Sequence, residues 1–408
     1  MVGKRQSVTL GTLTLALLLL VATSMQAQTE IVLHNFNGKN GGGNPYAGPI
    51  LDSSGNLYGT TLYGGKYGYG TVFKLSPGPN GKWVETVLHS FNLDGQDGIR
   101  PYSNLVMDSA GNLYGTTYLG GPNGMPVGAG TVFEIIPGKN GWTEKVLHSF
   151  NFDGPDGFEP YSNLVFDAQG NLYGTTSSGG TESSGIVFEL SPNPDGTWAE
   201  NIILSFDYTH GGDPQAGVVF DRAGHLYGTT QYGGDFTHGT VFELERQHNG
   251  TWKESVLHSF DPENGDGFNP MAGLVISPSG QLYGTTLYGG SDGSGAVFEV
   301  EKVKGVWQES VIHSFNEDND GTSPYGPLAL DSAGNLYGTT VVSYAGAGIV
   351  FELSKNKQIW DETIVYQFPP LGHGGNPYSG VALDGTGNIY GTTYMGGRPA
   401  GVVFEITR

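Results

Sequence analysis

Cysteine is absent from this chain of 408 residues, and its absence removes several kinds of site. Without a thiol the protein can form no disulfide bond, no thiolate metal site, no cysteine nucleophile and no lipid-modified cysteine. A chain of this length can bury an adequate core without disulfides. Its stability must therefore come from packing and hydrogen bonding.

Basic residues are scarce. Lys and Arg number 18 against 39 Asp and Glu, so the formal net charge is −21. A surface this acidic repels nucleic-acid phosphates and anionic membranes, and we expect neither as a partner. The same acidity also serves solubility, and that simpler interpretation stays open.

Only one long apolar run is present. Leu10 to Val21 is too short to span a bilayer, follows the basic pair Lys4 and Arg5, and precedes a cleavage signal that ends at Ala27. We interpret residues 1–27 as a secretory signal peptide, whose removal takes away two positive charges and leaves a net charge of −23. We expect a secreted or periplasmic protein with no membrane insertion and no C-terminal anchor.

Apolar residues at helical spacing are also missing, and a repeat fills the chain instead. Its signature, Tyr-Gly-Thr-Thr, recurs at intervals of 56, 59, 54, 56, 54 and 53 residues. The copies begin at Tyr58, Tyr114, Tyr173, Tyr227, Tyr283, Tyr337 and Tyr390. A period this regular indicates a repeat architecture.

Each repeat has the pattern of four short strands joined by turns. In the second repeat a proline opens the apolar run 103–107, and an Asp-x-x-Gly turn leads to 112–117. A Gly-rich loop then leads to 130–134, and a polar turn leads to 142–150. Four antiparallel strands per unit are typical of a propeller blade. We therefore predict an all-β fold, a seven-bladed β-propeller with four antiparallel strands per blade.

The two ends of the repeat array complement each other. The chain starts with a fourth-type strand, 30–36, and stops after a third-type strand, 401–406. If the N-terminal strand completes the last blade, residues 28–408 form one closed ring without open sheet edges. All six tryptophans fit this register, because each stands two residues before the Glu of a fourth strand. We expect a closed, monomeric ring.

Aromatic residues follow the prolines that open the blades. The connections between blades and the second-to-third loops within them should share one face, where binding residues are expected. Two blades carry Gln215 and Met271 after the proline, and the other five carry tyrosine, namely Tyr46, Tyr102, Tyr161, Tyr325 and Tyr378. Tyrosine rings suit stacking on sugars, so we predict ligand binding there, with Tyr232 in a nearby loop. The alternative is that these rings only wedge between blades.

The fourth repeat departs most clearly from the pattern. His210, Asp213 and His238 fall in the two loops of the expected binding face. A His/Asp pair could perform acid–base chemistry on a glycan or, with the second His, hold a metal. His373 and Arg398, in the corresponding loops of the seventh repeat, are further ligand-binding candidates. Drift of loop sequences produces such pairs as well.

Acidic loops between blades offer hard oxygen ligands. The candidates for a Ca²⁺ site are Asp94, Asp97, Asp153 and Asp156. Asx-turn chemistry explains the same residues, and we expect no other cofactor. Recurrent histidines such as His89 lie inside strands and are interpreted as packing residues, because Leu204 and Tyr366 replace them elsewhere.

The string Gly-Asn-Leu-Tyr-Gly-Thr-Thr, followed by Gly-Gly and Gly-Thr-Val-Phe, resembles the GloVer-type tandem repeat of exported bacterial proteins. The resemblance covers essentially the whole mature chain. It transfers no activity and no catalytic residues, and the surface-sorting segment of many members is not found here. More loosely, the Asp-x-x-Gly-Asn-Leu-Tyr turn is similar to that of lactonase-like and NHL-type propellers. Lactonase-like propellers use metal-binding acids near the axis, where this sequence has Ser, Ala, Asn and Gly.

Three functions fit these observations. We favour an exported, non-enzymatic module that binds a glycan or an extracellular protein through its loop-rich face. The alternative is a polysaccharide-degrading enzyme, a lyase or hydrolase, with its site at His210, Asp213 and His238. A purely structural envelope protein is the third.

Overall fold

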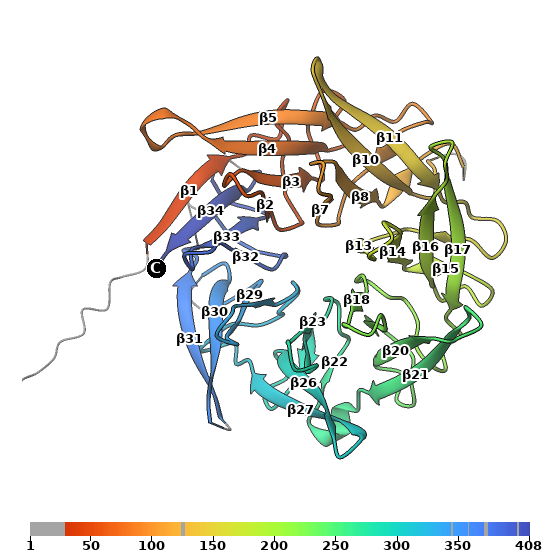
Figure 1. The fold of residues 1–408 in the computed structure, drawn as a ribbon. Coiled ribbons are helices and arrows are strands. Elements are labelled where there is room, and N and C mark those ends of the chain that lie inside the picture. The colour runs from red at the N-terminus through yellow and green to blue at the C-terminus, as the bar shows by residue number, and fades with distance from the viewer. Residues whose placement is uncertain (1–28, 124–126, 344–345, 358, 371–373, 398–399) are drawn as a thin grey trace, which may run out of the picture.

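The computed structural model describes residues 29–123, 127–343, 346–357, 359–370, 374–397 and 400–408. Within these residues the strands form seven four-stranded sheets around a central axis, as Figure 1 shows. Neighbouring strands in the sheets run antiparallel. The predicted seven-bladed propeller is confirmed. The predicted signal peptide, residues 1–27, lies outside the described residues.

In blades 1 to 4 the strands follow chain order from the axis outward (Figure 1). Blade 1 contains β2 (Ile50–Leu51), β3 (Leu57–Thr61), β4 (Thr71–Pro77) and β5 (Trp83–Ser90). Blade 2 contains β7 (Val106–Met107), β8 (Leu113–Thr117), β10 (Thr131–Gly138) and β11 (Gly141–Ser149). Blade 3 contains β13 (Val165–Phe166), β14 (Leu172–Thr176), β16 (Ile186–Pro192) and β17 (Trp198–Ser205). Blade 4 contains β18 (Val219–Phe220), β19 (Leu226–Thr230), β20 (Thr240–Arg246) and β21 (Trp252–Ser259).

Blades 5 and 6 repeat this order, and blade 7 takes its outer strand from the other end of the chain. Blade 5 contains β23 (Val275–Ile276), β24 (Leu282–Thr286), β26 (Ala296–Val303) and β27 (Val306–Ser314). Blade 6 contains β28 (Ala329–Leu330), β29 (Leu336–Thr340), β30 (Ile349–Asn356) and β31 (Ile359–Gln367). Blade 7 contains β32 (Ala382–Leu383), β33 (Ile389–Thr393), β34 (Val402–Thr407) and β1 (Thr29–Asn35).

The N-terminal strand closes the ring as predicted. β1 pairs antiparallel with β34 from Thr29↔Thr407 to Asn35↔Val402, and Figure 1 shows the two ends side by side. The junction between blades 7 and 1 also carries a hydrogen bond, in which Thr392 Oγ1 donates to the carbonyl of Ala47 at 2.9 Å. Because β1 pairs with β34, the third strand of blade 7 is not left as an open sheet edge.

The connections between blades pair with the second-to-third loops of the blade they enter. Three such contacts are two-stranded sheets: β6 (Gly98–Ile99) with β9 (Leu119–Gly120), β12 (Gly157–Phe158) with β15 (Ser178–Gly179), and β22 (Gly267–Phe268) with β25 (Tyr288–Gly289). The other four are single bridges: Gly43↔Tyr63, Gly212↔Tyr232, Thr322↔Val342 and Gly375↔Met395. The two sets of loops therefore share one face, as predicted.

In the Tyr-Gly-Thr-Thr strand the tyrosine forms hydrogen bonds within its own blade, and the glycine makes room there for an aromatic ring. In blade 2 the Tyr114 hydroxyl lies 3.1 Å from the Asp108 carboxylate and 2.7 Å from that of Glu134. Gly115 leaves room for a ring, because a Cβ there would lie 2.7 Å from the Phe133 side chain. The buried tyrosine thus ties the Asp-x-x-Gly turn to the third strand, and the glycine admits the core phenylalanine.

The two threonines of the motif hold strands and blades together. Thr116 Oγ1 donates to the carbonyl of Ser162 in the next blade at 3.1 Å, and the hydroxyls of Thr117 and Thr131 lie 2.8 Å apart. The inter-blade bond recurs around the ring, from Thr60, Thr116, Thr175, Thr229, Thr285, Thr339 and Thr392. The first threonine of the repeat signature therefore joins each blade to the next by a hydrogen bond.

The apolar core lies between blades. One buried cluster joins Tyr114 and Leu147 of blade 2 to Leu172 and Phe188 of blade 3. Trp198 on the outer strand of blade 3 packs against Tyr114, with ring centroids 6.5 Å apart. Each blade thus completes the core of its neighbour, which explains why the repeats form a ring.

Helix is confined in the described residues to two single 3₁₀ turns, η1 (Pro79–Gly81) and η2 (Pro262–Asn264). No helix in that part of the chain has the length and apolar character needed to cross a membrane.

Candidate functional site

The residue before each blade-opening proline has an unusual backbone conformation. Its φ angle lies between 54° and 60° in all seven blades, at Asn44, Arg100, Glu159, Asp213, Asn269, Ser323 and Asn376. Residues before proline ordinarily favour extended backbone. A left-handed conformation costs about 1–2 kcal/mol for most residues, although Asn and Asp tolerate it better. Asn and Asp, which together occupy four of the seven positions, therefore suit this conformation best.

Asparagine compensates for this conformation with a hydrogen bond across the blade junction. The side-chain Nδ2 donates to a backbone carbonyl of the preceding blade at 3.0–3.1 Å from Asn44, Asn269 and Asn376. Carboxylates cannot donate this bond, yet blades 3 and 4 carry Glu159 and Asp213 at the same position. Strained residues that depart from a structural rule often mark functional sites.

The predicted tyrosines gather at the mouth of the axis. The Tyr46 ring stacks on Tyr378 at 5.0 Å and meets the edges of Tyr102 and Tyr325 at 5.0 and 5.7 Å. We call the connected rings the tyrosine cluster, which comprises Tyr46, Tyr102, Tyr118, Tyr161, Tyr325, Tyr378 and Tyr394. Much of this cluster is ring-on-ring packing, so part of the expected funnel is filled by the tyrosines themselves.

Beside the tyrosine cluster lies a cavity of about 780 Å³, which we call the bowl. Gln215 and Met271, which replace tyrosine after their prolines, are part of its wall. Its other polar walls come mainly from blades 3 and 4: Glu159, Ser177, Ser178, Ser183, Ser184, Tyr208, Asp213 and Gln231. A second cavity, of only about 60 Å³, lies beneath the same tyrosines and has Asn104 and Asn163 in its wall. The bowl is thus open to a ligand where the repeat loses two of its tyrosines.

Burial and the Glu159 charge change the protonation of two groups in the bowl. Burial raises the pKa of Asp213, the Glu159 charge raises it further, and a hydrogen bond from Gln215 Nε2 at 2.5 Å acts in the opposite direction. Burial, together with the nearby Glu159 carboxylate, raises the pKa of Tyr118 to about 12. The bowl therefore combines aromatic faces, neutral hydroxyls and amides with two carboxyl groups.

The structure does not bring the three residues of the fourth repeat into one site. Asp213 lines the bowl, whereas His210 lines a different cavity of about 760 Å³ beside the outer strands of blades 4 and 5. His210 Nδ1 is bound to Asp207 Oδ2 at 2.9 Å, which raises the His210 pKa. His238 packs its ring on Phe268 at 5.3 Å. Only Asp213 of the three faces the tyrosine cluster.

Three further binding candidates lie apart from the bowl or outside the description. Tyr232 is 37% exposed and forms the bridge to Gly212, but it is not part of the bowl wall. His373 and Arg398 lie outside the described residues.

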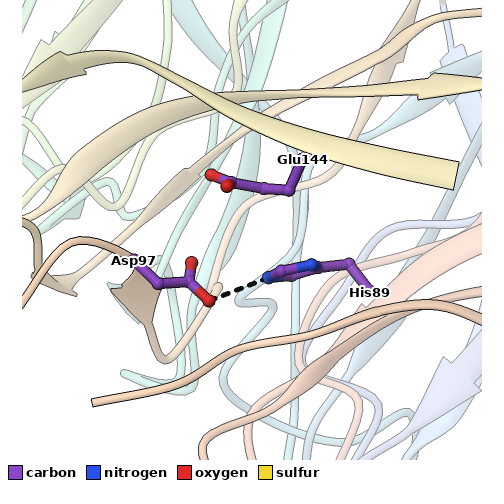
Figure 2. Close-up of side chains that lie close together, drawn as sticks. All are labelled: His89, Asp97 and Glu144. Atoms are coloured by element: carbon purple, nitrogen blue, oxygen red, sulfur yellow. Dashed lines mark hydrogen bonds and ion pairs between the residues drawn. The ribbon is translucent and has the colours of Figure 1, made fainter. Parts of the chain in front are cut away.

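Two of the calcium candidates, Asp97 and Asp156, lie at blade junctions near the recurrent histidines. Figure 2 shows His89 and Asp97 of one junction with Glu144 from the outer strand of the next blade. His89 Nε2 lies 2.9 Å from Asp97 Oδ2, and the three ligand atoms lie within 4.8 Å of one another. The same grouping occurs at His148, Asp156 and Glu200 and at His258, Asp266 and Glu309. One imidazole nitrogen and two carboxylates are fewer oxygens than Ca²⁺ usually takes.

The other two calcium candidates belong to local turns. Asp94 Oδ1 accepts hydrogen bonds from the backbone N–H groups of Gln96 and Asp97, at 2.9 and 3.1 Å. The backbone N–H of Asp153 donates to Asn151 Oδ1 at 2.8 Å. Both contacts are the Asx-turn chemistry considered from the sequence.

Burial of the junction glutamates changes their protonation. It raises the pKa to about 7 at Glu85, Glu144, Glu200 and Glu309. Where tyrosine replaces the histidine, its hydroxyl contacts the junction glutamate instead: Tyr366 donates to Glu30 Oε2 at 2.8 Å. The recurrent histidines are therefore polar links between blades as well as packing residues. The glutamate that partners each of these histidines is the one that stands two residues after a Trp in the sequence.

The repeats of this chain match a known family of repeat proteins. Residues 20–200 and 193–404 match the Gloeobacter/Verrucomicrobia repeat. The chain belongs to this repeat family. None of the curated proteins matches its sequence.

Solved structures similar to this member of the repeat family share only its fold. A protein from Bacteroides uniformis, provisionally described as a 6-phosphogluconolactonase, has 16% identity and a TM-score of 0.50, with 85% of this chain and 89% of that chain covered. A protein from Lactobacillus plantarum has 15% identity and a TM-score of 0.52, with 86% and 99% covered. At these identities the likeness carries no functional residue across.

Sequence reasoning did not single out Glu159, which the structure places in the wall of the bowl. The signal was present, because the residue before the opening proline is Asn in three blades and a carboxylate in two consecutive ones. What the sequence could not show was the positive φ at this position, which is costly for Glu159. Asp213 was selected for its neighbour His210, whereas the structure places it with Glu159.

Proposed function

We propose that the protein is an exported, non-enzymatic propeller that binds a glycan in the bowl. The observation that carries the proposal is the position of the bowl: an aromatic and polar cavity opens where Gln215 and Met271 interrupt the tyrosine cluster. Its volume of about 780 Å³ is within the range of small-ligand sites, which is about 300–1,000 Å³. It has room for a short stretch of sugar chain.

The chemistry of the walls supports a sugar over an apolar ligand. Sugars offer hydroxyl groups at their edges and C–H faces that pack on aromatic rings. Tyr161 and Tyr208 supply aromatic surface, while Gln215, Gln231 and the serines supply hydrogen-bond partners. Carboxylates accept hydrogen bonds from neutral hydroxyls, and such charge-assisted bonds are stronger than neutral ones.

The test is co-sedimentation of the purified protein with a panel of insoluble polysaccharides. A matched pair of variants locates the binding. Tyr208 in the bowl is 47% exposed, and Tyr67 in a loop of blade 1 is 45% exposed but lies outside the bowl wall. We expect Tyr208→Ala to weaken binding at least several-fold and Tyr67→Ala to leave it unchanged. Equal loss in both variants, or no retention on any polysaccharide, would refute the proposal.

A second candidate function is hydrolysis of the bound glycan. The observation that favours it is the pair of carboxyl groups in one cavity, with the pKa of Asp213 raised by burial and by Glu159. Paired carboxyl groups of unequal pKa are the usual acid and base of glycoside hydrolases. New reducing ends counted in the same tubes, absent with Asp213→Asn, would make the protein an enzyme. Bound polysaccharide without new ends supports the binding module.

A further inference from the structure

The charges on the bowl wall all have one sign. Glu159 and Asp213 are its ionisable acids, and no Lys, Arg or His is among the described residues that line it. Arg100, at the equivalent position of blade 2, opposes the burial that raises the pKa of Tyr102 to about 12, but it is not part of the wall. A ligand bound in the bowl therefore meets negative charge without a compensating protein cation.

The two acids occupy a position with a left-handed backbone, which disfavours Glu159 although Asp213 tolerates it. Glu159 and Asp213 have φ angles of 60° and 55°, and they replace the asparagine that bridges to the preceding blade at Asn44, Asn269 and Asn376. Neither carboxylate can donate that bridge, so the bridge does not explain why acids stand at these two positions. Retained strain at a cavity wall is typical of a group that serves a ligand.

The aromatic wall favours the same kind of ligand. Cations bind over the faces of tyrosine rings, and an ammonium group can donate to two carboxylates while it lies against a ring. The Glu159 charge raises the pKa of Asp213, a repulsion that a bound cation would relieve. The net charge of −21 attracts cations from a distance.

We infer that the ligand of the bowl is a glycan with free amino groups, such as a glucosamine oligosaccharide, whose ammonium group is held by Glu159 and Asp213. This inference rests on the proposed glycan-binding function and narrows it to a substrate class. N-acetylation would remove the positive charge and add bulk, so the neutral form should bind much more weakly.

The experiment is calorimetric titration of the purified protein with fully de-N-acetylated and fully N-acetylated glucosamine oligosaccharides of equal length. We expect the amino form to bind at least ten-fold more tightly, with an affinity that falls as salt is added. Glu159→Gln and Asp213→Asn should each reduce its affinity at least five-fold. Asp235→Asn, an exposed acid of a blade 4 loop outside the bowl, is the matched control and should have no effect.

The outcomes separate the two proposals. Equal binding of both oligosaccharides, or unchanged affinity in both bowl variants, overturns the amino-sugar inference and leaves glycan binding standing. Binding of neither oligosaccharide, together with no retention on polysaccharides, overturns both. A titration with CaCl₂ alone completes the set: Ca²⁺ binding that is lost in Glu159→Gln, without amino-sugar binding, would make the bowl a metal site and overturn the inference. Melting curves of each variant confirm that it is folded.

Discussion

The side-chain amide of Asn44 donates a hydrogen bond to the backbone carbonyl of Tyr394, 3.0 Å away across the junction between blades 1 and 7. Asn44 has a φ angle of 55°, so the bond compensates for a conformation that most side chains avoid. Glu159 stands at the same place in blade 3 without an amide to donate. This pair of residues allows stability and binding to be separated by mutation.

We expect Glu159→Asn to raise the free energy of unfolding by about 1 kcal/mol, because asparagine tolerates the left-handed backbone and restores the inter-blade bond. The same variant should lose amino-sugar binding, as expected of a group kept for function at a cost in stability. Urea unfolding measures the first effect and calorimetric titration the second.

The reciprocal variant is the control. Asn44→Glu removes the bond to Tyr394 and should lower the free energy of unfolding by about 1–2 kcal/mol. A lower stability of Glu159→Asn would show that Glu159 has a structural role and would contradict the account of the bowl.

Much of the architecture could be predicted because each repeat contains the short-range signals for its own turns and strands. The opening proline and the strand pattern are short-range signals that occur seven times, and the Asp-x-x-Gly turn occurs in six blades, with Ser277 in place of Asp in the fifth. Ring closure followed from the mismatch between a fourth-type strand at 30–36 and a third-type strand at 401–406. The five tyrosines that follow the opening prolines lie together, with their rings in contact, and their role in ligand binding stays a prediction.

The residues of the candidate site were harder to predict because their positions depend on contacts between blades. His210 and Asp213 are near neighbours in sequence, yet one faces the outer strands and the other the bowl. Glu159 and Asp213 are distant in sequence and share a wall only because blades 3 and 4 are adjacent. Local pattern favoured the His/Asp pair, whereas the superposition of repeats would have singled out the two acids.

The glycine of Tyr-Gly-Thr-Thr gives a test of the core packing. A Cβ at Gly174 would lie 2.6 Å from the Phe188 ring and 2.9 Å from Leu164, so Gly174→Ala forces the core to move. Overpacking of this kind costs about 1–3 kcal/mol, and we expect a fall of that size in urea unfolding. Gly385→Ala is the control, because a Cβ there meets nothing within 4 Å. Equal stability of the two variants would contradict the role given to the glycine.

Calcium at Asp97 and Asp156 stays a prediction, and chelation tests it. Ca²⁺ takes about six to eight oxygen ligands, whereas each junction offers one histidine nitrogen and two carboxylates. We therefore expect removal of calcium with EGTA to leave the melting temperature unchanged. A fall in melting temperature that added Ca²⁺ reverses, and that Asp97→Asn abolishes, would establish the calcium site instead.

The junction glutamates predict how stability depends on pH. Burial raises the pKa of Glu144 from 4.5 to about 7, with Asp97 and Asp94 adding to the rise and His89 opposing it. A carboxyl with a raised folded-state pKa stabilises the fold below its unfolded pKa, and that contribution is lost as pH rises through about 7. Melting temperature should therefore fall between pH 5 and pH 8 by an amount to which Glu144 contributes.

Glu144→Gln isolates this contribution, because the amide stays neutral across the same interval. We expect the variant to be more stable than the parent at pH 8 by about 1–3 kcal/mol and to differ little at pH 5. Glu182→Gln, at an exposed loop position, is the control and should follow the parent at both pH values. His34, whose pKa burial lowers, acts in the opposite direction, so the comparison between variants and not the total pH profile is the measurement. An unchanged or lower stability of Glu144→Gln at pH 8 would mean that the carboxylate is ionised and held by His89 at the junction.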